Sequence, residues 1–442
     1  MIINKPSIEV RGGNTYLISL IKNEVTNIEE EFYYSVPNEY GEYLCHDNAD
    51  AFVVAMLIPA LMSGQDIKIK APISEMLFYK LENSLIFLLS KVFDRDIIKV
   101  FPDTIENFIF SPNAIATGFS GGVDSFTTVV QHTSETCPKS LRLTHLTLFN
   151  VGAYGNDEKK SQIAFENDAI RAKKVSRIMS INLVLLNSNI SKAYEVKEIT
   201  HGNSPRAAMC IISGVLSLQK LFKLYLIASS NTVDKIKLDQ WYQSSYESLV
   251  AYFLSTPNNH IIIANSDINK VEKLKQISGN KLVQNNIYVC ASDILNEKSK
   301  IKLEKGFKPN CSECFKCLNT MVVLDILGCL EKYDNSFDLQ KYRDRKTSYF
   351  RHLIRNANKD RMLKETYDLI AERNYKVPKE VLAQLRMKRL KDRLFLLKRK
   401  ALRFVNFKLI KTPIKHLIKF FSSIFSLNSQ KKNKFRITGS KI

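Results

Sequence analysis

Residues 114–125, AIATGFSGGVDS, decide how the central part of this chain folds. The apolar run 114–119 has the length and composition of a buried strand. Ser120, Gly121 and Gly122 are turn residues, and residues 126–131 have the pattern of a beginning helix. A strand, a glycine-rich turn and a helix in this order predict the first unit of an α/β fold.

The same alternation continues on the C-terminal side of this stretch. Further short apolar runs occupy residues 145–151, 182–186, 224–228, 260–264 and 287–290, with longer helical stretches such as 161–179 and 207–222 between them. This pattern predicts an α/β fold with a doubly wound, mainly parallel sheet. Sheets of this kind bind ligands beyond the carboxyl ends of their strands, so the turns that follow the strands are candidate site positions.

The turn after residues 114–119 has the chemistry of an anion site. Gly121 and Gly122 carry no Cβ, so successive backbone N–H groups can curve around a phosphate at the start of a helix. The hydroxyls of Ser120 and Ser125 can add hydrogen bonds, whereas the carboxylate of Asp124 would repel a phosphate unless a divalent cation lay between them. Asp124 therefore predicts magnesium. The turn is not a Walker loop, because it lacks the Gly-Lys-Ser/Thr ending.

The SGGxDS motif resembles the pyrophosphate loop (PP-loop) of the ATP pyrophosphatase superfamily, the adenine nucleotide alpha hydrolase-like enzymes. The likeness covers about residues 114–320 and rests on Ser120, Gly121, Gly122, Asp124 and Ser125. It implies a HUP-like core and cleavage of ATP between the α and β phosphates, giving an adenylated intermediate and pyrophosphate. Asp124, Ser120 and Ser125 are then the candidate catalytic residues, and Asp124 is the candidate magnesium ligand.

Three further nucleotide-binding candidates follow from position alone. Asn150 ends the second predicted strand of this series, and Ser229 and Ser230 end the fourth. Turns at these places commonly frame the nucleotide in enzymes of the superfamily that the motif resembles.

Four cysteines form a candidate metal site. Cys311, Cys314 and Cys317 have C-x2-C-x2-C spacing, and Cys290 ends a predicted strand upstream. Eight cysteines in 442 residues are too few for a disulfide scaffold, and four thiolates suit a closed, tetrahedral zinc site. The other four cysteines are expected to be small buried side chains.

A PP-loop followed by one cysteine and then such a triplet resembles 7-cyano-7-deazaguanine synthase. That enzyme binds zinc through four cysteines and converts a carboxylate, with ammonia, to a nitrile. The present chain departs from it in the long gap between Cys290 and Cys311 and in additional segments at both ends.

A second likeness is to uncharacterised PP-loop proteins of surface-polysaccharide gene clusters. It rests on the stretches FSGGVDSF, HG, VEK and CSECFKCLNTM. The residues that fall on recurrent positions, without an assigned role, are His201, Gly202, Asp239, Glu272 and Lys273.

Length and charge divide the chain into parts. A chain of 442 residues exceeds what one hydrophobic core usually serves. We expect an N-terminal α/β domain (residues 1–112), a PP-loop ATP-binding domain with the zinc site (113–335), a helical extension (336–377) and a basic amphipathic tail (378–442). The formal net charge is +21, but residues 379–442 hold 19 Lys and Arg against Glu380 and Asp392, so almost all of it belongs to the tail.

The N-terminus lacks the pattern of a secretory signal, and no apolar run is long enough to span a bilayer, so we expect a cytoplasmic protein. Residues 410–425 of the tail carry an apolar helical face flanked by lysines, which favours peripheral attachment to the anionic inner face of a membrane. A disordered extension, or helices packed on the core, is the alternative.

Three functions are compatible with these features. The first is ATP-dependent formation of an amide or nitrile, with AMP and pyrophosphate as products, on a small-molecule or lipid-linked carboxylate such as a surface-polysaccharide precursor. The second is a tRNA-modifying thiolation enzyme, which the apolar stripe in the basic tail disfavours. The third is a nucleotide-binding membrane scaffold without turnover. The sequence indicates neither the acceptor, nor the source of the nucleophile, nor the oligomeric state.

Overall fold

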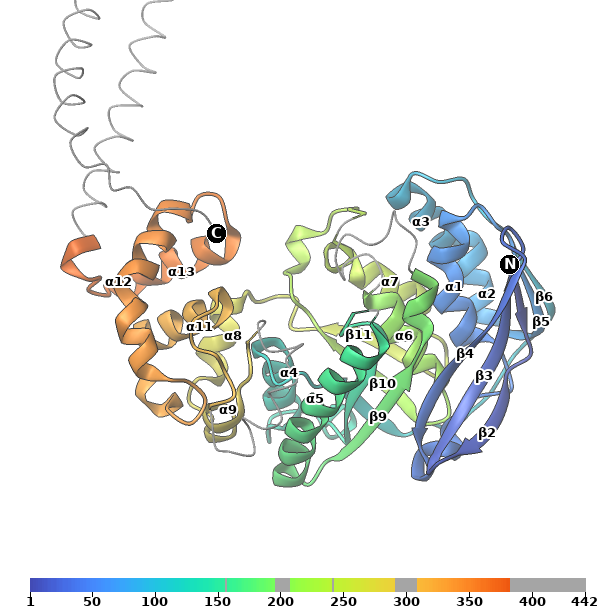
Figure 1. The fold of residues 1–442 in the computed structure, drawn as a ribbon, viewed down its shortest axis with the longest axis horizontal. Helices are drawn as coiled ribbons and strands as arrows, with labels where there is room; N and C mark the ends of the chain where they lie inside the picture. Colours follow the sequence, from blue (N-terminus) through green and yellow to red (C-terminus); the bar gives the residue numbers. More distant parts are fainter. Residues whose placement is uncertain (156, 195–206, 241, 291–307, 382–442) are drawn as a thin grey trace, which may run out of the picture. The chain divides into compact units, whose positions relative to one another are not determined.

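The computed structural model describes residues 1–155, 157–194, 207–240, 242–290 and 308–381. Almost all described residues belong to one compact unit, Met1–Lys376 (Figure 1). The predicted tail lies almost entirely outside the described residues, as do His201 and Gly202. None of the helices that the structure describes is long and apolar enough to cross a membrane.

The strands of this unit form one eleven-stranded mixed sheet, most of whose neighbouring pairs are parallel. They are β1 (Ile2–Asn4), β2 (Ser7–Arg11), β3 (Asn14–Asn23), β4 (Ile28–Pro37), β5 (Ile67–Ser74), β6 (Val100–Glu106), β7 (Ala114–Gly118), β8 (His145–Asn150), β9 (Asn182–Ser188), β10 (Phe222–Ala228) and β11 (His260–Ala264). The predicted α/β class with a mainly parallel sheet is therefore confirmed.

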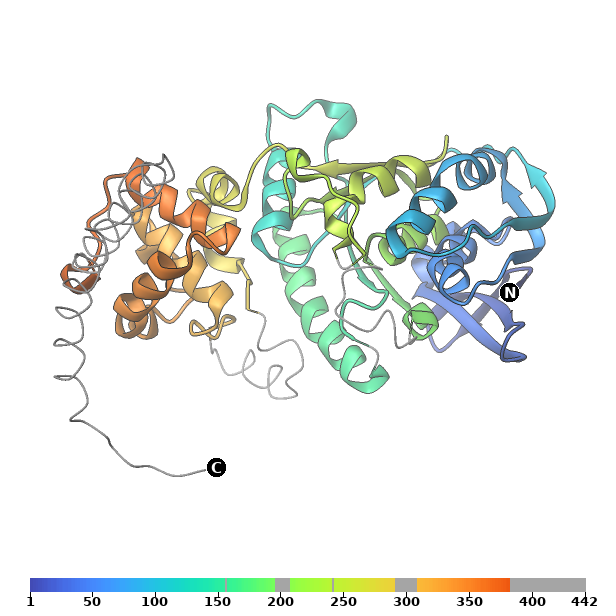
Figure 2. The same cartoon turned by 90° about the horizontal axis from the view of Figure 1, so that it is seen from above.

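The helices lie between and after these strands (Figures 1 and 2). They are α1 (Asp50–Met62), α2 (Glu75–Lys80), α3 (Ile86–Phe93), α4 (Val123–Thr133), α5 (Glu158–Met179), α6 (Ala207–Ser217), α7 (Glu247–Leu254), α8 (Lys270–Ile277), α9 (Lys281–Asn286), α11 (Phe315–Ile326), α12 (Leu339–Asn356) and α13 (Arg361–Glu372).

The parallel part of the sheet has the order β11-β10-β7-β8-β9. When the strands are numbered along the chain with β7 as 1, this order is 5-4-1-2-3. Strands β8 and β9 are therefore added on one side of β7, and β10 and β11 on the other. The order changes direction between β7 and β10. A doubly wound sheet leaves a crevice for ligands at this point, beyond the carboxyl ends of the two strands. The SGGVDS turn follows β7 directly.

The N-terminal strands continue the same sheet. The middle strand β3 pairs antiparallel with β1, β2 and β4, and β4 pairs antiparallel with β9 through Tyr34 opposite Ser188 and Ser35 opposite Asn187. One sheet therefore spans the predicted boundary at residue 112. The division of the first 376 residues into three domains stays a prediction.

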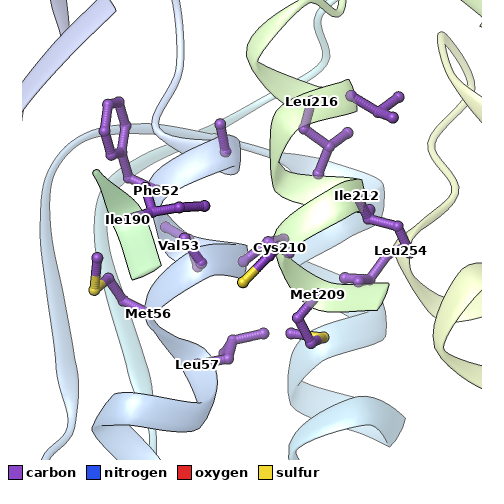
Figure 3. Packing of buried hydrophobic residues seen from close by; sticks show 14 of the residues in the cluster. Phe52, Val53, Met56, Leu57, Ile190, Met209, Cys210, Ile212, Leu216 and Leu254 are labelled. Carbon is purple, nitrogen blue, oxygen red and sulfur yellow. The ribbon is translucent and has the colours of Figure 1, made fainter. Parts of the chain in front are cut away.

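The core between the two parts of the sheet contains helices α1 and α6. Twelve of the 13 residues of α1 are buried, so this helix is apolar on every side, as a helix inside a protein must be. Figure 3 shows Val53 and Leu57 of α1 facing Cys210 and Met209 of α6. Apolar burial of this extent is the main favourable term in the stability of a domain.

One predicted strand is wrong. Residues 287–290 follow α9 in an irregular conformation instead of joining the sheet. Their backbone turns to the loop after β7, since Tyr288 N donates a hydrogen bond to Gly121 O at 2.8 Å. Ile287, Tyr288 and Cys290 are buried although the segment pairs with no described strand.

Candidate functional site

The turn between β7 and α4 is a glycine-shaped loop. Gly121 has φ +75°, and a Cβ at this residue would lie 3.4 Å from the Cβ of Tyr288. Gly122 precedes the first residue of α4, so the loop opens onto the N-terminus of an eleven-residue helix. Helix N-termini favour anions because their first N–H groups lack intrahelical partners.

Both serines of the motif help to shape this turn. Ser120 Oγ lies 3.3 Å from Ser125 Oγ and accepts a hydrogen bond from Gly122 N at 3.4 Å. Ser125 Oγ donates to Gly122 O at 3.1 Å and is buried. Only Ser120 is exposed, so it is the hydroxyl that a ligand would reach.

Two lysines of α8 hold the carboxylate of Asp124. Lys270 Nζ lies 2.7 Å from one oxygen and Lys273 Nζ 3.2 Å from the other. The two residues share one face of the helix because they are three positions apart. Asn269 starts this helix by accepting a hydrogen bond from the backbone of Glu272, whose own side chain pairs with Lys275 instead.

Lys273 joins the loops after β7 and β10. Its side chain is buried, and Nζ also donates a hydrogen bond to the carbonyl oxygen of Ser229. Ser229 thus lies beside the SGGVDS turn, across the change in strand order. Ser230 is exposed and accepts a hydrogen bond from Arg361 at 3.4 Å through its carbonyl oxygen. The structure therefore brings Ser229 close to Asp124 through an intervening lysine.

A mostly buried carboxyl group lies behind Ser229. Glu247, the first residue of α7, accepts a hydrogen bond from Ser229 Oγ at 3.3 Å. Burial raises the pKa of Glu247 from 4.5 to about 7, because a charged carboxylate loses hydration there. This places a group that titrates near neutral pH next to the candidate site.

A cavity of about 230 Å³ opens beside the loop. Charged side chains of both signs reach it from different parts of the chain: Asp124, Asp168, Lys270 and Lys316. The other lining residues that the structure describes are Ser120, Gly122, Val123, Leu274, Tyr288, Val289, Cys290, Asn319, Thr320 and Met362.

One wall of this cavity is fixed by an aromatic and ionic cluster. The guanidinium of Arg171, on α5, lies 3.8 Å from the centre of the Tyr288 ring and pairs with Asp168. Asp168 also accepts a hydrogen bond from Tyr154 at 2.9 Å. Since Tyr288 N bonds to Gly121 O, this cluster fixes the loop as well as the wall.

Asn150 lies elsewhere. Its amide donates to Asn187 Oδ1 at 2.7 Å and accepts from Ser161 Oγ at 2.9 Å. It lines a second cavity, which shares no described lining residue with the cavity beside Asp124. Asp239 does not line either cavity and lies 3.4 Å from Lys237 Nζ.

The four predicted metal ligands meet. The sulfurs of Cys290, Cys311, Cys314 and Cys317 all lie within 4.8 Å of one another. Backbone N–H groups of Glu313 and Cys314 donate to Cys311 Sγ at 3.5 and 3.3 Å, as they would to a thiolate. The pKa of Cys317 is raised by its hydrogen bond with Cys290 and by burial. Four neighbouring thiolates would repel one another, so the cluster needs a cation to compensate their charge.

The distances fit zinc. A tetrahedral site with Zn–S bonds of about 2.3 Å places its sulfurs roughly 3.8 Å apart, and Cys311 Sγ lies 3.9 Å from Cys317 Sγ. This cluster could hold a metal such as zinc. It is the one group of three or more such ligands found among the described residues.

Magnesium has a weaker fit. Asp124 is a single carboxylate whose two oxygens already face lysine ammonium groups. Magnesium is, however, commonly held by one or two carboxylates together with the phosphates of a substrate. A single carboxylate therefore suits a magnesium ion that binds together with a polyphosphate, and it does not suit a permanently bound magnesium ion.

Several residues of the site were not singled out from the sequence. Lys270 directly precedes the VEK stretch. Its spacing of three residues from Lys273 could have indicated that both lysines share one face of a helix. Glu247, Arg171 and Asp168 carry no motif, because long-range packing alone brings them to the site.

No family model matches this chain, and neither a curated protein nor a solved structure does.

Proposed function

We propose that the chain binds ATP at the loop after β7 and adenylates a carboxylate, which a nitrogen nucleophile then attacks. The observation that carries this proposal is the position of the SGGVDS turn. This turn combines a left-handed glycine, a helix N-terminus and a cavity at the point where the strand order reverses. The strand order also supports assignment of the parallel part to the HUP-like PP-loop fold.

The chain's own groups have distinct tasks in this reaction. The backbone N–H groups around Gly121 and Gly122 bind the departing pyrophosphate, and the exposed hydroxyl of Ser120 adds a hydrogen bond. Lys270 lines the cavity, and its ammonium group neutralises charge that develops on the leaving oxygens. Lys273 is buried and keeps Asp124 and the β10 loop in place.

Magnesium, when bound with the nucleotide, would polarise the phosphate oxygens. Asp124 would be its ligand from the chain. Lys270, the more exposed of the two lysines, would then turn from Asp124 towards the phosphates. Zinc bound by four thiolates has no open coordination position, so its task is structural.

The test is product analysis. The purified protein is incubated with ATP, magnesium and a panel of carboxylates, and hydroxylamine is added to trap acyl adenylates as hydroxamates. We expect AMP, pyrophosphate and hydroxamate in equal amounts. Asp124→Asn should lose at least about tenfold in rate, equivalent to about 1.4 kcal/mol. Asp234→Asn, on an exposed acid that pairs with Lys235, should keep the rate. ADP and phosphate as the products would contradict the proposal.

One observation favours sulfur transfer as a second candidate function. Cys290 lines the same cavity as Asp124, so a cysteine of the metal cluster lies within reach of a bound substrate. In that case the cluster would contain iron and sulfide. Metal and sulfide analysis after anaerobic purification separates the two: zinc without sulfide supports the first function, and iron with sulfide supports thiolation.

A further inference from the structure

The second cavity has a chemistry of its own. Its volume is about 220 Å³, and it lies at the carboxyl ends of β8 and β9, where Asn150 and Asn187 end or nearly end their strands. Ser161 and Gln162, in the first turns of α5, form another side, and Tyr33 of β4 reaches it from the N-terminal strands. The carboxyl edge of a parallel sheet is where such folds bind their ligands.

Side-chain amides line this cavity as a connected row. Asn150 Nδ2 donates to Asn187 Oδ1 at 2.7 Å, and Asn187 Nδ2 donates to Gln162 Oε1 at 3.1 Å. The hydroxyl of Ser161 donates to the other end of the row at Asn150 Oδ1, at 2.9 Å. This row fixes the orientation of each amide, because donors and acceptors must alternate along it.

The row presents both donors and acceptors to a ligand. An amide has two N–H donors and an oxygen with two lone pairs, and each bond in the row uses one of these. A hydroxyl group, which donates and accepts, matches such a surface. A phosphate or carboxylate, which only accepts, would leave the amide oxygens opposed to its own oxygens.

Charge at this cavity is balanced and peripheral. The charged lining residues are Glu158 and Lys192, both exposed, and Lys192 Nζ lies 3.4 Å from Glu158. The lining thus offers no net charge to an ionic ligand. Tyr33, which is partly buried, adds an aromatic ring whose face can pack on the C–H groups of a saturated ring.

We propose that this cavity is a binding site for a neutral polyhydroxylated ring, that is, one unit of a sugar. The lining carries no net charge and offers hydrogen bonds, the volume suits a single small ring, and the position is on the same sheet edge as the SGGVDS loop. The site is distinct from the cavity beside Asp124, and its occupation does not depend on ATP binding.

Binding is tested on the full chain by saturation-transfer NMR and calorimetry, with glucose and N-acetylglucosamine as probes at millimolar concentration. We expect saturable binding of at least one sugar. Gln162→Met removes one amide of the row at nearly constant size, and Asn187→Ser removes another. Each should weaken binding at least tenfold, while Gln276→Met should leave it unchanged. Gln276 is the matched control because this exposed glutamine accepts a hydrogen bond from another glutamine side chain, Gln131, away from the cavity.

Two results would overturn the proposal. The first is failure of every sugar to bind, or equal binding by all three variants. The second is displacement of the sugar by adenosine, with adenosine binding lost in Gln162→Met, because the cavity would then hold a nucleoside. Variants are compared only after their melting temperatures show that they are folded. Absence of ATP turnover with intact sugar binding would refute the adenylation reaction and leave this site in place.

Discussion

Replacement of Gly121 tests the role of the SGGVDS loop separately from that of the rest of the fold. A non-glycine residue in its left-handed conformation costs about 1–2 kcal/mol. We expect Gly121→Ala to lower the free energy of unfolding by this amount and to abolish ATP binding, since the strained loop would no longer direct its N–H groups at the phosphate. Chemical denaturation and calorimetry measure the two effects.

Gly64→Ala is the matched control for this substitution. Gly64 has φ +63° but no atom within 4 Å of the added Cβ. It should show a similar loss of stability with unchanged ATP binding. Equal nucleotide binding by both variants would mean that the loop is not the ATP site.

Glu247 makes stability depend on pH. Its folded pKa of about 7 lies above the value of 4.5 for an ordinary glutamate. Its stabilising contribution is therefore fully present below pH 4.5 and is lost as the pH rises through about 7. Glu247→Gln, which has no ionised form, should gain up to about 3 kcal/mol relative to the parent protein between pH 5 and pH 8. Urea unfolding without nucleotide at several pH values measures this gain, and a difference that does not change with pH would show that Glu247 titrates normally.

At the scale of elements, the cysteine cluster supports two walls of the cavity. Cys290 follows Tyr288 by two residues, and Cys317 lies in α11, which also supplies Lys316, Asn319 and Thr320 to the lining. Loss of the metal should therefore loosen the SGGVDS loop, because Tyr288 N donates a hydrogen bond to Gly121 O in that loop.

We expect one zinc per chain and its loss in Cys314→Ser. Stability should fall by more than about 4 kcal/mol, as is characteristic when a structural metal is removed. Hydrogen exchange should show faster exchange at the Tyr288 amide in the same variant. Cys137→Ser, on a cysteine outside the cluster, should retain the metal. Unchanged exchange at Tyr288 after zinc loss would show that the cluster and the loop are independent.

The parts of the fold that follow local patterns were predictable from the sequence. Alternating strands and helices gave β7 to β11 to within a few residues, and cysteine spacing indicated the metal cluster. The pairing of β4 with β9 was not predictable, because it joins residues more than 150 positions apart through two registered pairs. The two lysines at Asp124 and the separate cavity of Asn150 likewise depend on how distant segments pack.

At the scale of the whole molecule, the tail remains a prediction from sequence. Residues 379–442 carry +17 of the net charge of +21 and an apolar helical face. We expect the full chain to float with vesicles that contain anionic lipid and not with neutral vesicles. A chain that ends at Lys376, the last residue of the compact unit, should float with neither. Equal flotation of both chains would refute attachment through the tail.

The junction of β4 with β9 also has a consequence during synthesis. The β4 edge, which β9 covers in the finished sheet, has no partner until residue 188 has left the ribosome, 154 residues after Tyr34. At translation rates of roughly 5–20 residues per second this interval lasts on the order of 10 s. A strand edge that stays open for so long is a site for mispairing with another chain. Aggregation of nascent chains should therefore be most frequent for products that stop between β4 and β9.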